Sequence, residues 1–237
     1  ANLDALDASK FSTTQVSGLN TTAVSNLTTT QVAALTTAEV GALTASQVGT
    51  LTTTEVRAFS TAQAGAFTAT QIGGLTTTQV GNFSTTQLNA LTTTQTRGLT
   101  TAQLNGLTQA NLDALDASKF STTQVSGLNT TAVSNLTTTQ VAALTTAEIG
   151  ALTASQVGTL TTTEVRAFST AQAGAFTATQ IGGLTTTQVG NFSTTQLNAL
   201  TTTQTRGLTT AQLNGLTQAN LDALDASKFS TTQVSGL

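Results

Sequence analysis

The sequence predicts an all-α superhelical solenoid of very short capped helices, with one helix for each eight-residue repeat. Three observations lead to this prediction. An eight-residue period runs without interruption between Leu27 and Leu107. In each octad of this stretch, the Ser or Thr at the second position is followed three residues later by Gln or Glu, a spacing typical of the capping box at a helix N-terminus. The octads also recur within a much longer repeat, so each unit has neighbours on which to stack.

The octads follow the consensus [LF][ST]xx[QE][VIL]xx, and Gly, Ala or Asn is common at the last two places. The N-cap hydroxyl of Thr28 is expected to accept a hydrogen bond from the N–H of Gln31, whose side chain returns to the N-cap N–H. Leu27 and Val32 then take the two places of a hydrophobic staple. The small residue that follows is expected to end the helix in a left-handed conformation. Each octad therefore encodes a helix N-terminus, a hydrophobic staple and a helix C-terminus.

Stacking between octads must stabilise helices this short, because isolated helices below roughly 12 to 15 residues are marginal in water. We expect Leu, Phe, Val and Ile to lie inside the solenoid and Thr, Gln, Asn and Ser to lie outside. Small Ala and Gly residues at the junctions would let successive turns approach closely. Phe59, Phe67 and Phe83 substitute for Leu at the first octad position, so they are predicted to be core residues.

A β-solenoid is the alternative fold, and disorder is a third reading. Thr, Val, Ile and Phe favour strands, whereas Ala does not. The first and sixth octad positions have opposite parity, so a continuous strand would send them to opposite faces. A bend within each octad, with sixteen residues forming one coil, would repair this mismatch. The capping pattern favours the helical solenoid.

A 109-residue repeat organises the chain, with a first copy at 1–109, a second at 110–218 and the start of a third at 219–237. The first two copies differ only where Val40 becomes Ile149. Each copy contains thirteen octads and one pentad, and at the first pentad Leu6 is followed by Phe11 after five residues instead of eight. Because neither end of the sequence coincides with an octad boundary, we expect one continuous solenoid that is a window of a longer polypeptide.

Absent residue types argue against catalysis. The sequence has no His, Cys, Met, Trp, Tyr or Pro, so the commonest general base, the activated thiol and the soft metal ligands are missing. We expect no enzyme activity and no catalytic, cofactor-binding or metal site. The net charge of −3 is thinly spread, which argues against nucleic-acid partners. No apolar run is long enough to predict a membrane span.

The first charge cluster comprises Asp4, Asp7 and Lys10, and it recurs at Asp113, Asp116 and Lys119 and at Asp222, Asp225 and Lys228. A calcium site is one hypothesis, but two carboxylates fall short of the six to eight oxygens that calcium usually takes. We instead expect Asp7 to cap the pentad and Lys10 to pair with it. Arg57 and Arg97 are expected to be solvated.

The run LTTAEVGALTASQVGTLTTTEV resembles the octad arrays of large repetitive bacterial secreted and surface proteins, often described as adhesin-like or haemolysin-like. The resemblance spans essentially the whole chain. It implies an extracellular or cell-surface location and a role as a stalk, fibre or matrix component. Association with other copies of the chain, and contact with cell-surface or matrix glycans, would follow from such a role.

We therefore expect a structural protein that forms an extracellular filament, fibre or surface layer through repeat stacking and self-association. The alternative is the stalk or spacer of a bacterial adhesin. Ice binding by ranks of Thr on a solenoid is a further alternative. The capping interpretation opposes ice binding, because it assigns the first hydroxyl of each octad to the backbone of its own helix.

Overall fold

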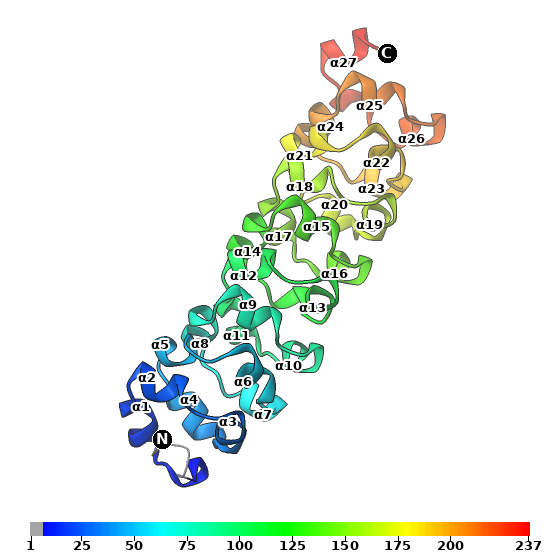
Figure 1. The fold of residues 1–237 in the computed structure, drawn as a ribbon. Helices are drawn as coiled ribbons and strands as arrows, with labels where there is room; N and C mark the ends of the chain where they lie inside the picture. Colours follow the sequence, from blue (N-terminus) through cyan, green and yellow to red (C-terminus); the bar gives the residue numbers. More distant parts are fainter. Residues whose placement is uncertain (1–6) are drawn as a thin grey trace. The chain divides into compact units, whose positions relative to one another are not determined.

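The computed structural model describes residues 7–237, which belong to two compact units, residues 1–120 and residues 121–237. Each unit is built from helices of three to six residues, and no strand occurs in the described part of the chain. The predicted all-α repeat solenoid is thus confirmed, and the β-solenoid alternative is wrong. Figure 1 shows the short helices of each unit following one another in successive coils.

The described helices of the first unit are η1 (Ala8–Lys10), α1 (Thr13–Gly18), α2 (Thr21–Ser25), α3 (Thr29–Ala34), α4 (Thr37–Ala42), α5 (Ala45–Val48), α6 (Thr53–Ala58), α7 (Thr61–Ala64), α8 (Ala69–Gly74), α9 (Thr77–Gly81), α10 (Thr85–Asn89), α11 (Thr93–Gly98), α12 (Thr101–Asn105), α13 (Gln109–Asp113) and η2 (Ala117–Lys119).

The helices of the second unit are α14 (Thr122–Gly127), α15 (Thr130–Ser134), α16 (Thr138–Ala143), α17 (Thr146–Ala151), α18 (Ala154–Val157), α19 (Thr162–Ala167), α20 (Thr170–Ala173), α21 (Ala178–Gly183), α22 (Thr186–Gly190), α23 (Thr194–Asn198), α24 (Thr202–Gly207), α25 (Thr210–Asn214), α26 (Gln218–Asp222), η3 (Ala226–Lys228) and α27 (Thr231–Ser235).

Capping boxes begin most of these helices, as predicted. At α3 the N–H of Gln31 donates to Thr28 Oγ1 over 3.2 Å, and the N–H of Thr28 donates to Gln31 Oε1 over 2.9 Å. Where the third helical residue is Ala23, the N-cap is Asn20, whose side chain accepts the Ala23 N–H alone. Each cap satisfies N–H groups that a helix of one turn could not pair internally.

The helix C-termini differ from the prediction. No described residue, glycine included, has a positive φ, so the expected left-handed ends are wrong. At α3 the chain leaves the helix through Leu35 in an extended conformation, with φ −60° and ψ 137°, and the Leu35 N–H donates to the Val32 carbonyl. An extended exit is sufficient here because the same Leu side chain enters the core and the next N-cap follows at once.

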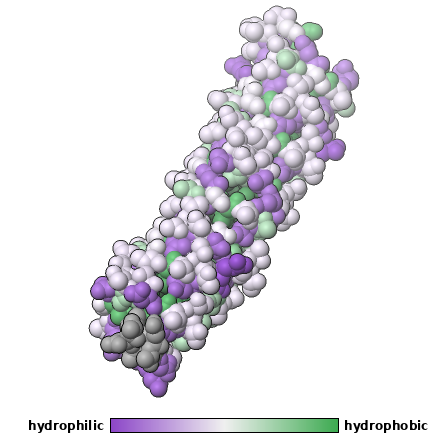
Figure 2. Space-filling view, in the orientation of Figure 1, coloured by the Kyte–Doolittle hydropathy of each residue, from purple (hydrophilic) through white to green (hydrophobic). Residues whose placement is uncertain are grey.

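The core contains the first and sixth octad positions. Leu27 is 3% exposed, and Val32 is fully buried. Phe59, Phe67 and Phe83 are buried as predicted, and the first two pack edge to face with ring centroids 5.1 Å apart. On the face seen in Figure 2 the surface is mostly neutral or hydrophilic, and hydrophobic residues show only in small spots.

Successive turns stack three octads apart. In the first unit α5 packs on α8 and α8 on α11, and in the second unit α18 packs on α21 and α21 on α24. Small residues permit this approach, since a Cβ at Gly98 would lie 2.5 Å from the Ala69 carbonyl oxygen. The expected close junctions are confirmed. A solenoid turn therefore contains about three octads, a number that the repeat pattern alone does not give.

Candidate functional site

The contact between successive turns depends on the Gln of the capping box, and the prediction that Gln lies outside the solenoid is wrong for these residues. Gln47 is only 2% exposed. Its Oε1 accepts from the N–H of Thr44 over 2.6 Å, and its Nε2 donates to the carbonyl oxygens of Val16 and Leu19 over 3.0 and 2.6 Å. One side chain thus closes its own helix start and joins it to the backbone 31 and 28 residues earlier.

This inter-turn bridge recurs along both units. In each case the Gln Nε2 lies 2.5 to 2.7 Å from a carbonyl oxygen 28 residues earlier. The pairs in the first unit are Gln47–Leu19, Gln63–Leu35, Gln71–Leu43, Gln79–Leu51, Gln87–Phe59, Gln95–Phe67 and Gln103–Leu75. The pairs in the second unit are Gln156–Leu128, Gln172–Leu144, Gln180–Leu152, Gln188–Leu160, Gln196–Phe168, Gln204–Phe176 and Gln212–Leu184.

The sequence-based prediction missed this role because the capping box involves only the oxygen of the Gln amide and leaves its NH₂ group unassigned. The capping box needs an oxygen acceptor, which Glu supplies as well as Gln. The preference for Gln at this position is the signal that a second, donating group is required. Buried polar groups are costly unless they are hydrogen-bonded. The amide meets that condition by engaging two turns at once.

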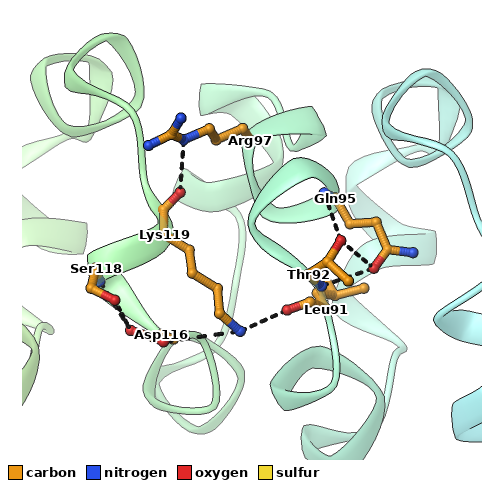
Figure 3. A network of polar contacts seen from close by, with 7 residues as sticks. All are labelled: Leu91, Thr92, Gln95, Arg97, Asp116, Ser118 and Lys119. Atoms are coloured by element: carbon orange, nitrogen blue, oxygen red, sulfur yellow. Dashed lines mark hydrogen bonds and ion pairs between the residues drawn. The ribbon is translucent and has the colours of Figure 1, made fainter.

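The pentad replaces Gln with Lys at the same bridge (Figure 3). Lys119 is the third residue after the N-cap Asp116, and its Nζ donates to the Leu91 carbonyl oxygen over 2.7 Å. The Arg97 Nε donates to the carbonyl oxygen of Lys119 over 3.3 Å, which fixes the pentad from the other side. Lys228, Leu200 and Arg206 repeat the arrangement in the second unit.

The pentad cap also sets the charge state of its carboxylate. The hydroxyl and the N–H of Ser118 donate to Asp116 over 2.6 and 3.0 Å, and Lys119 lies 3.9 Å away. The Ser118 hydroxyl, its N–H and the Lys119 charge hold the pKa of Asp116 below its usual value, against a smaller opposing effect of burial. The sequence-based prediction of a capped and paired pentad is confirmed.

The first pentad shows the same cap. Asp7 accepts from the N–H of Ser9, and Lys10 Nζ lies 3.4 Å from the Asp7 carboxylate. Asp4 of the calcium hypothesis lies outside the described residues. Within residues 7–237, no three His, Cys, Asp or Glu side chains are grouped so that they could hold a metal ion.

A turn that contains a pentad is shorter by three residues. Gln233 Nε2 donates to the carbonyl oxygens of Leu208 and Thr205, which lie 25 and 28 residues earlier instead of the 28 and 31 of an ordinary bridge. The distances, 2.7 and 2.8 Å, match those of the ordinary bridges. The bridge therefore tolerates the deletion, and the shortening is taken up elsewhere in the turn.

Outside the bridges, the described surface offers shallow hollows. One of about 590 Å³ in the first unit is lined by Thr61, Thr85, Asn89 and Asp113 among others, and the second unit repeats it with about 650 Å³. These side chains are exposed. The side chain of Arg57 is exposed as predicted, whereas exposed Arg97 contacts the pentad backbone. In the described part of the chain, no helix has the length and apolar character needed to span a bilayer.

Comparison with known families matches part of the chain to a repeat model. The ALTTAQ repeat matches residues 40–77, 53–85, 149–186 and 162–194. The same octads are matched in both complete long repeats, so the chain is similar to this class of repeat array at two equivalent places. No curated protein matches the chain.

Proposed function

We propose that this chain is a structural protein that forms an extracellular filament, fibre or surface layer. The bridge between turns carries the proposal. Gln71 donates to Leu43 of the preceding turn, while Leu75, just beyond α8, accepts from Gln103 of the following turn. Each turn is therefore a donor in one direction and an acceptor in the other. A pattern of this kind propagates along an array and supplies cohesion without any closing element.

The composition supports the same proposal. With only seven cationic and ten acidic residues, parallel copies of the array would experience little electrostatic repulsion. The 109-residue repeat presents the same surface at regular intervals, which favours association between copies of the chain. Glycans of a cell surface or matrix are proposed as further partners, because the exposed side chains are largely hydroxyl and amide groups.

Electron microscopy of native material with helical analysis tests the assembly. We expect filaments whose axial period corresponds to the 109-residue repeat. Dispersed compact particles at all concentrations would contradict the proposal. The location is tested separately by antibody labelling of intact cells, and labelling that requires permeabilisation would contradict an extracellular role.

The second candidate is the stalk of a bacterial adhesin, in which the array holds a binding domain away from the cell. The ALTTAQ match favours a repeat array without specifying what the array carries. Determination of the full-length gene product separates the two candidates. A non-repetitive terminal domain that binds cells after the repeats are removed would support the stalk.

A further inference from the structure

The chain contains four arginines, and two of them have no partner in the described part of the structure. Arg97 and Arg206 donate to the pentad backbone. Arg57 on α6 and Arg166 on α19 lie at equivalent places in the two long repeats, and both side chains are exposed. Within residues 7–237 neither of them pairs with a carboxylate. Their guanidinium groups are therefore available to an external anion.

Arg166 borders a hollow between α19, α22, α23 and α26. The hollow has a volume of about 380 Å³, which falls in the range of about 300 to 1,000 Å³ typical of small-ligand sites. Among the described residues that line it, only Arg166 carries a charge. The residues that the argument uses are Arg166, Gly190, Asn191, Thr217 and Asn220.

Gly190 keeps this hollow open. A Cβ at Gly190 would meet nothing within 4 Å, whereas a Cβ at Gly207 would lie 2.5 Å from the Ala178 carbonyl oxygen. The packing of successive turns therefore requires glycine at position 207 but not at position 190. Asn220 Nδ2 donates to the Gly190 carbonyl oxygen over 3.0 Å, which holds this wall of the hollow in place.

The hollow also offers hydrogen-bonding groups beside the guanidinium. Asn191 Nδ2 donates to the Thr187 carbonyl oxygen over 2.8 Å, so Asn191 Oδ1 remains an acceptor. The Thr217 hydroxyl oxygen accepts from the Asn220 N–H over 3.3 Å, and its O–H can still donate. The guanidinium of Arg166 has the planar fork of N–H donors that suits a carboxylate. A ligand that carries both a carboxylate and hydroxyl groups matches this set.

Neighbouring helices do not compensate the charge of Arg166. α19 packs on α16 and α22, and neither of these helices contains Asp or Glu. Glu164 on α19 is buried and accepts from the Thr161 N–H, and residues two apart on a helix do not face each other. The two larger hollows contain Asp113 or Asp222 and no Lys or Arg among their described lining residues. Those hollows would repel an anionic ligand, which the hollow at Arg166 would attract.

Arg57 has the same setting in the first unit. Asn111 Nδ2 donates to the Gly81 carbonyl oxygen over 2.8 Å, and Asn82 Nδ2 donates to the Thr78 carbonyl oxygen over 2.8 Å. A Cβ at Gly81 would also meet nothing within 4 Å. Each complete long repeat therefore has one arginine beside such a set of polar groups.

We propose that Arg166 and Arg57 each bind the carboxylate of a uronic-acid unit in an acidic saccharide. The assignment rests on the glycan contact proposed above, and it names the class of glycan and the place of contact. The guanidinium pairs with the carboxylate, while Asn191 and Thr217 bind ring hydroxyls, as Asn82 and Thr108 do beside Arg57. Because the sites recur every 109 residues, a polysaccharide that reaches more than one of them is held by avidity.

Calorimetric titration of the whole chain with trigalacturonate tests the site. We expect one binding site in each complete long repeat, and much weaker binding of the neutral trisaccharide maltotriose. R57Q/R166Q changes only exposed side chains, so it is expected to fold and to bind trigalacturonate about tenfold or more weakly. The control K10Q removes an exposed cation outside the hollow and is expected to bind like the wild type. Unchanged binding in R57Q/R166Q would overturn the proposal.

Two further comparisons test the hollow and the sugar. G81A/G190A adds a methyl group at each hollow without a packing clash, so we expect weaker trigalacturonate binding without a lower Tm. Binding equal to that of the wild type would place the saccharide elsewhere and overturn the proposal. Triglutamate carries carboxylates without ring hydroxyls and is expected to bind more weakly than trigalacturonate. Equal affinity would overturn the assignment to a saccharide.

These titrations use the dispersed chain in solution, so they are independent of filament formation. A negative result would leave the filament assignment intact. Absence of filaments in electron micrographs would leave the measured affinity for trigalacturonate unchanged.

Discussion

Lys119 Nζ donates to the carbonyl oxygen of Leu91 over 2.7 Å and across 28 residues. Gln103 Nε2 makes the same contact with Leu75 over 2.6 Å and the same separation. An ammonium group and an amide therefore perform one structural task in this solenoid. The shared requirement is a donor that reaches a main-chain oxygen in the preceding turn, and it explains why the pentad can interrupt the octads without breaking the stack.

Replacement of Lys119 by Met removes the Nζ donor and leaves the Leu91 carbonyl oxygen without this hydrogen bond. We expect a loss of about 1 to 3 kcal/mol in unfolding free energy, measured by denaturant titration. The matched control is Lys10→Met, because the Lys10 side chain is 80% exposed whereas that of Lys119 is 24% exposed. The control is expected to change stability by less than about 0.5 kcal/mol. Equal losses in the two variants would contradict the bridging role.

The lowered pKa of Asp116 predicts a stability change in acid. A carboxyl group whose folded pKa lies below the ordinary value of 3.8 stabilises the fold above that value and loses its contribution as the pH falls through the folded pKa. The stability difference between the wild type and Asp116→Asn should therefore shrink below pH 3.8. Denaturant titrations at a series of acidic pH values measure this difference. A difference that does not change with pH would refute the assignment.

Gln71→Leu removes both halves of one bridge. The Thr68 N–H and the carbonyls of Val40 and Leu43 each lose a partner, and we expect a cost of about 2 to 4 kcal/mol. Thr70→Ala, at an exposed position of the same helix, serves as the control and should have little effect. Hydrogen exchange of the α8 amides localises the change. Unchanged protection in the Leu variant would argue against the bridge.

Gly98→Ala tests the close approach of α11 to α8. The added Cβ would lie 2.5 Å from the Ala69 carbonyl oxygen and 2.7 Å from the Ala69 Cα, and relief of this overlap is expected to cost about 1 to 3 kcal/mol. The control is Gly81→Ala, whose Cβ would meet nothing within 4 Å. That variant should be neutral or gain up to about 1 kcal/mol from lower backbone entropy in the unfolded chain. Thermal melts of both variants test whether the close approach of α11 to α8 requires glycine at position 98.

Thr205 occupies the sixth octad position, where Val is usual. Its side chain is fully buried, and its Oγ1 has no hydrogen-bond partner. Thr205→Val is nearly isosteric and removes the unsatisfied hydroxyl, so we expect a gain of about 1 to 2 kcal/mol. Thr203→Val, at an exposed position of the same helix, is the control and should change stability by less than about 0.5 kcal/mol. A destabilised Thr205→Val chain would show that the hydroxyl has a role.

The features predicted correctly from sequence are those determined within one octad. Thr28 and Gln31 lie three residues apart, so their capping box follows from local spacing. The burial of Leu27 and Val32 follows from the same frame, because an octad has large apolar side chains only at its first and sixth positions. The pentad cap at Asp7 was recognisable for the same reason.

The features that sequence reasoning missed depend on the stacking of turns. The partner of Gln47 Nε2 is the backbone carbonyl of Leu19. Every residue has a backbone carbonyl, so the residue type does not reveal which one accepts the hydrogen bond. The number of octads per turn depends on the packing of α5, α8 and α11, which the repeat does not encode locally. The extended exit at Leu35 replaced a left-handed end because the next cap begins before a longer C-terminal motif could form.

The backbone acceptors of the bridge bear on how such arrays vary in length. Val16, Phe59 and Leu75 differ in side chain, yet each accepts the bridging hydrogen bond through its main-chain oxygen. The bridge therefore depends on where the carbonyl oxygen lies in the turn and not on the identity of the residue that carries it. A gene for such an array can therefore gain or lose whole copies by recombination without any matching substitution at the new junction. Variation in the number of repeat copies between strains would then change the length of the array while leaving the hydrogen bonds at every junction unchanged.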